Sequence, residues 1–251
     1  MLQHLIASLA SRFGYVIRRQ RAAVKRTATG AGEGVPAELL MENIHGVDIY
    51  AGFDHTRYPN APTGWGSESP AFADLIREIK PGLIIEVGTW KGASAIRMAT
   101  LLRELGQGGK ILCIDTWLGA IEFWEDQADE ERFQQLACRH GYPQVYFHFL
   151  ANVCYAGFQD TIIPFPFHSS GASVWLLRRR VEADMIYIDA SHDHDDVYQD
   201  MSDYFSIVRR RGVLFGDDWD WVGVRSAVER FARDNQLKIE HLHDLWLIRK
   251  P

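Results

Sequence analysis

From residue 69 onward, short apolar runs alternate with longer stretches in which apolar side chains recur at helical spacing. The runs predict strands at 83–88, 110–115, 161–166, 184–189, 212–217, 237–242 and 245–249. The stretches between them predict helices at 70–79, 92–105, 144–157, 171–179, 195–209 and 221–235. Helices that alternate with buried strands are typical of βαβ units. The pattern therefore predicts an α/β protein with a mostly parallel seven-stranded sheet and helices on both faces.

The chain before this pattern divides into two parts. Residues 1–21 place apolar side chains at helical spacing and predict an amphipathic helix, an N-terminal extension suited to packing on its own domain, to a dimer contact or to peripheral contact with a membrane. Residues 22–66 predict a linker, and their last part, 51–66, is either an ordered surface loop or a lid over an acceptor. The folded domain is then expected to span 67–251.

Composition narrows the function classes. Hydrophobic residues make up 47% of the 251 residues and the net charge is -6, which fits a globular protein and argues against a nucleic-acid partner. Three cysteines without C-x-x-C spacing argue against disulfides and a cysteine zinc site. No apolar run is long enough for a membrane span. We therefore expect a cytoplasmic protein and, given the N-terminal helix, a homo-oligomer.

A glycine turn follows the first predicted strand. The strand runs into Gly88-Thr89-Trp90-Lys91-Gly92, and a helix begins directly afterwards. Such a turn brings a ligand against the backbone at the carboxyl edge of the sheet, because a glycine has no Cβ to obstruct the approach. Glu86 is a carboxylate in an otherwise apolar strand, which is costly unless it meets a donor. The turn alone is weak evidence, since tight connections of this kind occur in many doubly wound proteins.

The second predicted strand ends at Asp115, where an acid can accept both hydroxyls of a ribose. A dinucleotide fingerprint requires G-x-G-x-x-G, and here Trp90 stands in place of the middle glycine. These features favour a nucleoside ligand and weaken the alternative of an NAD enzyme.

Carboxylates gather after two later strands. Asp189 follows the strand at 184–189, and Asp217 and Asp218 follow the strand at 212–217. Neighbouring parallel strands would bring the three side chains together, where they repel unless a cation neutralises them. An all-oxygen set suits Mg²⁺ or Mn²⁺ better than zinc. The alternative is that these acids cap the following helices, which we favour for Asp193, Asp195 and Asp196.

The segment from Glu86 to Gly92, the acid Asp115 and the order of strands and helices together resemble the class I S-adenosylmethionine-dependent methyltransferases. The resemblance covers residues 65–250. The resemblance implies a Rossmann-like fold and S-adenosyl-L-methionine as cofactor. It assigns cofactor contacts to nine residues: Glu86, Gly88, Thr89, Trp90, Gly92, Ser94, Asp115, Thr116 and Asp189.

The acidic cluster resembles the metal site of a branch that methylates sugar and natural-product hydroxyls, including the macrocin-type glycoside O-methyltransferases. This resemblance implies magnesium ligands at Asp189, Asp217 and Asp218 and a catalytic base at His192. Cephalosporin-hydroxylase-like proteins are similar to the same scaffold. We expect O-methylation of a small-molecule acceptor such as a sugar.

Two other functions remain open. His192-x-His194-x-Asp196 has the spacing of the binuclear metal-dependent hydrolases, although that class needs further histidines on later strands. His241 and His243 are expected to be structural. The other alternative is a non-catalytic methyltransferase-like scaffold, which would have no evident reason to keep mutually repelling carboxylates.

Overall fold

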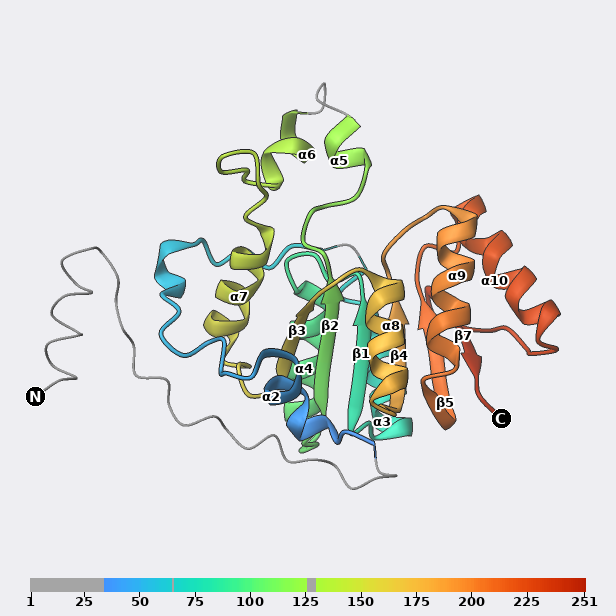
Figure 1. The fold of residues 1–251 in the computed structure, drawn as a ribbon. Helices are drawn as coiled ribbons and strands as arrows, with labels where there is room; N and C mark the ends of the chain where they lie inside the picture. The colour runs from blue at the N-terminus through green and yellow to red at the C-terminus, as the bar shows by residue number, and fades with distance from the viewer. Residues whose placement is uncertain (1–33, 65, 126–129) are drawn as a thin grey trace, which may run out of the picture. The chain divides into compact units, whose positions relative to one another are not determined.

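The computed structural model describes residues 34–64, 66–125 and 130–251 (Figure 1). These residues belong to one compact unit, Gly32–Pro251. The predicted helix at 1–21 lies outside the described residues.

A seven-stranded sheet forms the centre of this unit, in the order β3-β2-β1-β4-β5-β7-β6. Its strands are β1 (Leu83–Val87), β2 (Lys110–Asp115), β3 (Ile162–Pro166), β4 (Ala183–Ile188), β5 (Val208–Gly216), β6 (Glu240–Leu242) and β7 (Leu245–Arg249). The first five pair in parallel, and β7 pairs antiparallel with both β5 and β6. This topology confirms the predicted Rossmann-like α/β fold.

Helices cover both faces of the sheet. The α-helices are α2 (Leu40–His45), α3 (Pro70–Ile79), α4 (Ala93–Glu104), α5 (Glu122–Glu125), α6 (Glu130–Gln135), α7 (Val145–Ala156), α8 (Ser169–Arg178), α9 (His194–Phe205) and α10 (Val222–Asp234). Buried side chains of α2, α8, α9 and α10 pack on one face, and those of α3, α4 and α7 pack on the other. Because successive strand residues point to opposite faces, continuous apolar runs were needed to fill both layers.

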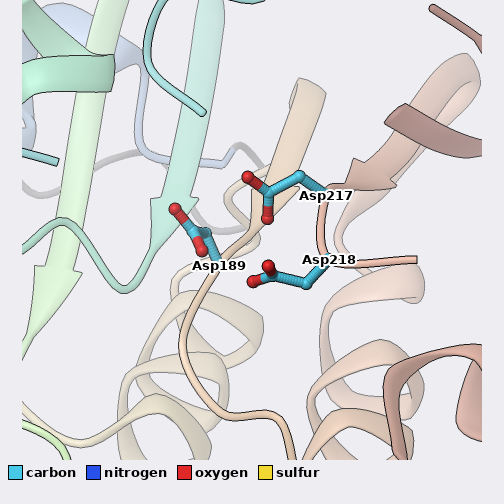
Figure 2. A group of neighbouring side chains, drawn as sticks. All are labelled: Asp189, Asp217 and Asp218. Carbon is cyan, nitrogen blue, oxygen red and sulfur yellow. The ribbon is translucent and has the colours of Figure 1, made fainter. Parts of the chain in front are cut away.

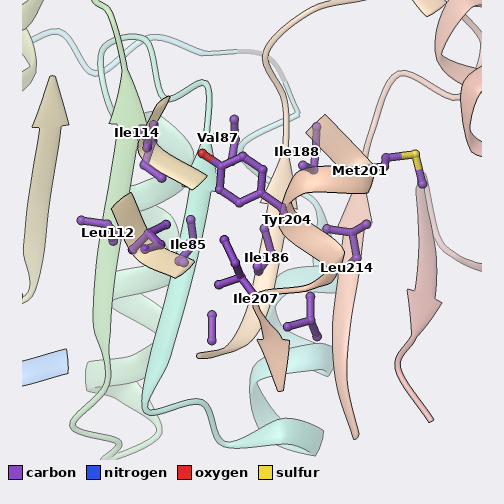
Figure 3. Packing of buried hydrophobic residues seen from close by; sticks show 14 of the residues in the cluster. Ile85, Val87, Leu112, Ile114, Ile186, Ile188, Met201, Tyr204, Ile207 and Leu214 are labelled. Carbon is purple, nitrogen blue, oxygen red and sulfur yellow. The ribbon is translucent and has the colours of Figure 1, made fainter. Parts of the chain in front are cut away.

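Figure 3 shows the layer between the sheet and α9. Alternate residues of β1, among them Ile85 and Val87, point to the same face as Ile186 of β4, and Met201 and Tyr204 of α9 meet them. These side chains are almost fully buried. Burial of one such apolar side chain contributes roughly 1.5–3 kcal/mol, so the layer holds the strand ends in fixed positions.

The strand order reverses between β1 and β4, which are neighbours with crossovers leading away in opposite directions. Ligands of open α/β sheets bind at such a switch point, outside the carboxyl ends of the strands. The glycine turn after β1 and the acids after β4 and β5 all lie at this edge.

The prediction differs from the structure at β5. The helix predicted at 195–209 ends at Phe205, and β5 begins at Val208 instead of residue 212. Val208 is followed in β5 by Arg209, Arg210 and Arg211, which are exposed and therefore lack the apolar signal of a strand. Arg209 is held there by a 2.7 Å ion pair with Asp184 of β4.

Residues 34–64 pack on the domain more closely than the composition of a linker suggests. They contain two 3₁₀ turns, η1 (Ala37–Leu39) and η2 (His55–Arg57), and the short helix α2. Leu40 is fully buried, and the Tyr50 hydroxyl donates to the Ile162 carbonyl over 3.0 Å. Within the described residues, no helix is long and apolar enough to cross a membrane.

Candidate active site

A cavity of about 680 Å³ opens at the carboxyl edge of the sheet. The glycine turn after β1, the end of β2, the start of α8 and the loop after β4 all contribute to its wall. Of the predicted site residues, those that line it are Gly88, Thr89, Trp90, Ser94, Asp115, Thr116, Asp189, His192 and Asp218. Most of the predicted site residues therefore line one cavity.

Gly88 fixes the distance between β1 and β4. Its φ is 82°, and a Cβ built on it would lie 2.1 Å from the carbonyl oxygen of Asp189. The Asp189 amide donates to the Val87 carbonyl over 2.8 Å. Only glycine permits both the left-handed backbone and this approach, so the turn and the first acid of the cluster are held side by side.

Glu86 does not line the cavity. It lies beneath the turn, fully buried, where its carboxylate accepts hydrogen bonds from Thr89 Oγ1 at 2.7 Å and from Ser94 Oγ. Burial raises its pKa to about 7, although these hydrogen bonds oppose the shift. Gly92, also predicted to contact the cofactor, lies against the Phe149 ring. Both residues support the shape of the turn.

Asp115 binds the turn from the other side. Its Oδ2 accepts from the backbone amides of Thr89 at 3.0 Å and Trp90 at 2.9 Å, and its Oδ1 accepts from that of Trp117 at 2.7 Å. Burial raises its pKa, and the backbone hydrogen bonds oppose that shift. Trp90 has a left-handed φ of 49°, which these bonds stabilise. Asp115 thus lines the cavity and also shapes its floor.

The three predicted metal ligands come together at the ends of β4 and β5. Figure 2 shows the carboxylates of Asp189, Asp217 and Asp218 pointing toward one another. One oxygen from each lies within 4.8 Å of the other two. Burial and the neighbouring acids raise the pKa of Asp189 well above its usual range, and burial with the adjacent Asp218 raises that of Asp217 to about 7. The cluster is therefore electrostatically strained without a cation.

These residues fit a hard divalent cation. All three offer oxygen donors, which Mg²⁺ and Mn²⁺ prefer. Asp217 Oδ1 is buried and has no hydrogen-bond partner among the described residues, as expected of an atom that awaits a ligand. Asp218 has a left-handed φ of 58°, an uncommon backbone conformation that often accompanies functional sites.

His192 is joined to the acidic cluster. Its Nε2 donates to Asp218 Oδ2 over 3.0 Å, and its ring stacks on Trp221 with centroids 4.3 Å apart and planes inclined by 10°. The hydrogen bond to Asp218 raises the pKa of His192. Because Nε2 carries the donated proton, Nδ1 is the atom left to accept one. The stacking and the hydrogen bond together fix the ring at the wall of the cavity.

The segment that follows β2 forms a second wall of the cavity. Phe123 lines the cavity and packs on Trp90 with ring centroids 4.7 Å apart. Trp117 is instead buried, and its Nε1 donates to the Trp90 carbonyl over 2.8 Å. It supports the turn from behind and offers no surface to a ligand.

Sequence reasoning missed the wall formed by α8 and α9. Phe167, His168 and Ser169 at the start of α8 line the cavity, as does Asp200 in the middle of α9. Asp200 shares the buried stripe of α9 with Val197, Met201 and Tyr204. An acid on the apolar face of a predicted helix is unusual, so the sequence alone could have indicated Asp200 as a candidate site residue.

The residues of the hydrolase-like motif, His192, His194 and Asp196, do not come together as one metal site among the described residues. His194 Nδ1 bonds to Ser226 Oγ of α10 at 2.7 Å, away from the acidic cluster. Among the described residues, the acid trio is the group with metal-ligand spacing, and it contains no histidine. As expected, His241 and His243 have structural contacts, with Trp219 and Asp74 respectively.

The fold and the turn define a class I methyltransferase scaffold, and the sequence comparisons agree. A family described as a methyltransferase domain matches residues 85–219, just over half of the 251 residues, and the chain belongs to this family. The resemblance to S-adenosylmethionine-dependent methyltransferases is thereby confirmed. Rhamnosyl O-methyltransferases of Mycobacterium bovis and Mycobacterium tuberculosis are 39% identical over 51 residues, 20% of this chain. The match spans 21% of those relatives' own length.

Solved structures share the fold at low sequence identity. An O-methyltransferase from Bacillus cereus in complex with SAH has a TM-score of 0.51 and 18% identity, covering 86% of this chain and 93% of its own. The O-methyltransferase NovP has a TM-score of 0.52 and 15% identity, covering 72% and 78%. The calicheamicin methyltransferase CalS11 has a TM-score of 0.53 and 16% identity, covering 71% and 77%.

Proposed function

We propose that this protein is an S-adenosylmethionine-dependent O-methyltransferase that acts on a hydroxyl of a sugar or another small-molecule natural product, with Asp189, Asp217 and Asp218 as ligands of Mg²⁺ or Mn²⁺. The observation that carries the proposal is the meeting of this acid trio with His192 beside the glycine turn. The rhamnosyl O-methyltransferase relatives, and CalS11, which is described as a TDP-rhamnose 3′-O-methyltransferase, support a sugar acceptor.

An alcohol is a poor nucleophile until its proton is removed or its pKa is lowered. A divalent cation at the trio would lower the pKa of a hydroxyl bound to it. His192 accepts the proton at Nδ1, because its Nε2–H is committed to Asp218. Asp218 keeps the imidazole oriented and stabilises its protonated form. The methyl group then passes from the donor's sulfonium to the oxygen, which leaves the thioether product and a methyl ether.

The chain's residues also position the donor. Asp115 offers carboxylate oxygens at the end of β2 for ribose hydroxyls, and the backbone at Gly88 leaves room for the donor's chain. The aromatic rings of Phe123 and Phe167 provide apolar surface for a base. All of these groups line the same cavity as His192, at one edge of the sheet.

The test is an assay of methyl transfer from labelled S-adenosylmethionine to a panel of rhamnosides and other sugars, with simple phenols for comparison. We expect turnover on a sugar hydroxyl that disappears with excess chelator and returns with Mg²⁺ or Mn²⁺. Full turnover in excess chelator would show that the trio has another role. Binding of NAD without binding of S-adenosylmethionine would refute the assignment altogether.

A further inference from the structure

Two runs of three arginines lie at the amino edge of the sheet, which is the edge opposite the cavity. Residues 178–180 close α8 and lead into β4, and residues 209–211 follow the first residue of β5. All six arginines are exposed. Because β4 and β5 pair in parallel, with Ala183 opposite Val208, the two runs are neighbours at this edge. Figure 1 shows α8 ending and β5 beginning at the same end of the sheet.

A bulge in β5 holds the second run out of the strand pairing. The register of β4 and β5 shifts here, so that Asp184 of β4 lies opposite residues 209–212 of β5. Gly212 closes the bulge, since a Cβ on it would lie 2.6 Å from the Asp184 carbonyl oxygen. Arg211 has a left-handed φ of 67°, and its amide donates to the Lys250 carbonyl over 3.0 Å. The backbone itself therefore presents these arginines at the surface.

The arginines retain most of their positive charge. Among the described residues, Arg209 is the one of the six that forms an ion pair, with Asp184 at 2.7 Å. The exposed acid beside the first run is Glu182. Burial lowers the pKa of Lys250, and the charge of Glu182 opposes that shift, so Glu182 lies close to another cation. This edge is therefore basic, although the net charge of the whole chain is -6.

Exposed aliphatic side chains accompany the arginines. Val174 is 46% exposed and Leu177 is 47% exposed, and they lie three residues apart on α8, on one face that leads to Arg178. A membrane surface accepts both kinds of side chain, because apolar groups enter the interface while arginines bind the anionic headgroups. Single-stranded nucleic acids are instead held by aromatic rings that stack on the bases. The surface therefore favours a lipid bilayer over a nucleic acid.

We propose that this basic surface, formed by residues 178–180 and 209–211 with Val174 and Leu177, binds the protein to bilayers that contain anionic lipids. Guanidinium groups stay charged at physiological pH and match phosphate oxygens in geometry and charge. The proposal goes beyond the methyl transfer, because the basic surface and the cavity lie at opposite edges of the sheet. A protein bound in this way keeps its cavity open to the donor and the acceptor.

Co-sedimentation of the full chain with vesicles tests the proposal. We expect binding to vesicles of equal parts phosphatidylcholine and phosphatidylglycerol, little binding to phosphatidylcholine alone, and weaker binding as salt is raised. The main variant changes four arginines to glutamine: Arg178, Arg180, Arg210 and Arg211. It should bind at least about 100-fold more weakly, since each basic residue near such a surface contributes about 5-fold.

The matched control removes as many charges at other exposed positions, by changing Arg77, Arg103, Arg233 and Lys238 to glutamine. It should lose less than about 10-fold, because distant charges are screened. Both variants should keep the wild-type unfolding temperature and affinity for S-adenosylhomocysteine, since none of these residues lines the cavity. Should the fourfold variant not fold, Arg178→Gln with Arg180→Gln leaves the bulge intact and should still cost about 20- to 30-fold.

Val174→Ser with Leu177→Ser tests the apolar part of the surface. This variant should weaken vesicle binding several-fold even at high salt, because apolar burial is not screened. DNA binding as tight as vesicle binding would assign the arginines to a nucleic acid and overturn the proposal. Vesicle binding that survives the fourfold change would overturn it too, and would assign the lipid contact to residues 1–21. Neither outcome affects the proposed methyl transfer, which is measured separately.

Discussion

His192 donates from Nε2 to Asp218 Oδ2 over 3.0 Å, which joins the predicted base to a predicted metal ligand. One carboxylate therefore has two tasks in the proposed mechanism: it contributes to the cation site, and it fixes which nitrogen of the imidazole is free. The two tasks can be separated by mutation, because the other two acids of the trio have no bond to His192 among the described residues.

The first prediction concerns His192 itself. His192→Ala should lower kcat by about 10²–10⁴-fold, the usual range for loss of a general base. Binding of S-adenosylhomocysteine and of Mn²⁺ should stay close to wild type, because the turn and the acid trio are intact. His194→Ala is the matched control, since His194 bonds to Ser226 and not to the cluster. Equal losses in the two variants would remove His192 from the mechanism.

The second prediction concerns Asp217. Asp217→Asn should abolish Mn²⁺ binding and turnover while leaving affinity for S-adenosylhomocysteine nearly unchanged, because Asp217 does not line the main cavity. In chelator the variant should unfold at a higher temperature than wild type, since one of three repelling carboxylates is gone. Asp195→Asn, in the exposed first turn of α9, is the control. Normal Mn²⁺ binding by Asp217→Asn would contradict the assignment of the trio.

The third prediction separates the two roles of Asp115. Asp115→Ala removes an acceptor for ribose, the two hydrogen bonds from the turn amides of Thr89 and Trp90, and the one from the Trp117 amide. Each bond to the charged group is worth about 1.5–3 kcal/mol. We expect at least a tenfold loss in affinity for S-adenosylhomocysteine, together with a lower unfolding temperature of the ligand-free protein. Unchanged stability would mean that the turn holds its shape without Asp115.

The alternation of apolar runs and helical spacing predicted the fold well because both faces of a covered parallel sheet must be apolar. The helix predicted at 70–79 has the observed bounds, and β2 was predicted with its observed bounds. The predicted start of β5 was wrong because its residues Arg209, Arg210 and Arg211 are exposed, and exposed polar residues give no apolar pattern from which a strand can be predicted. The short helices α5 and α6 were also missed, because four to six residues carry too little periodicity.

The site could be predicted where its residues directly follow strands. Gly88, Asp115, Asp189 and Asp218 all lie at strand ends, which the topology brings to one edge. The resemblance assigned a cofactor contact to Glu86, but Glu86 lies outside the cavity lining and accepts hydrogen bonds from the hydroxyls of Thr89 in the turn and Ser94 in α4. The α8 and α9 wall was missed because helix packing, and not strand order, brings its side chains to the cavity.

Asp200 of α9 gives the last prediction, because it is a buried acid that forms no ion pair within the part of the chain that the structure describes. It is 5% exposed, and burial raises its pKa from 3.8 to about 6, although a hydrogen bond with Ser169 opposes the shift. Between these two pH values the folded protein holds a proton that the unfolded chain has released. Stability therefore falls as pH rises through this window and reaches a constant penalty above about pH 6.

Asp200→Asn removes the ionisation while keeping the shape of the side chain. Relative to wild type, the variant should gain about 1–3 kcal/mol in free energy of unfolding at pH 7.5 and much less at pH 4.5, since one pKa unit corresponds to about 1.4 kcal/mol. Urea unfolding at a series of pH values, with exposed Asp160→Asn as control, measures the difference directly. Parallel stability curves for wild type and Asp200→Asn would mean that Asp200 is ionised at no cost, and a cation from the ligand or solvent would then have to neutralise it.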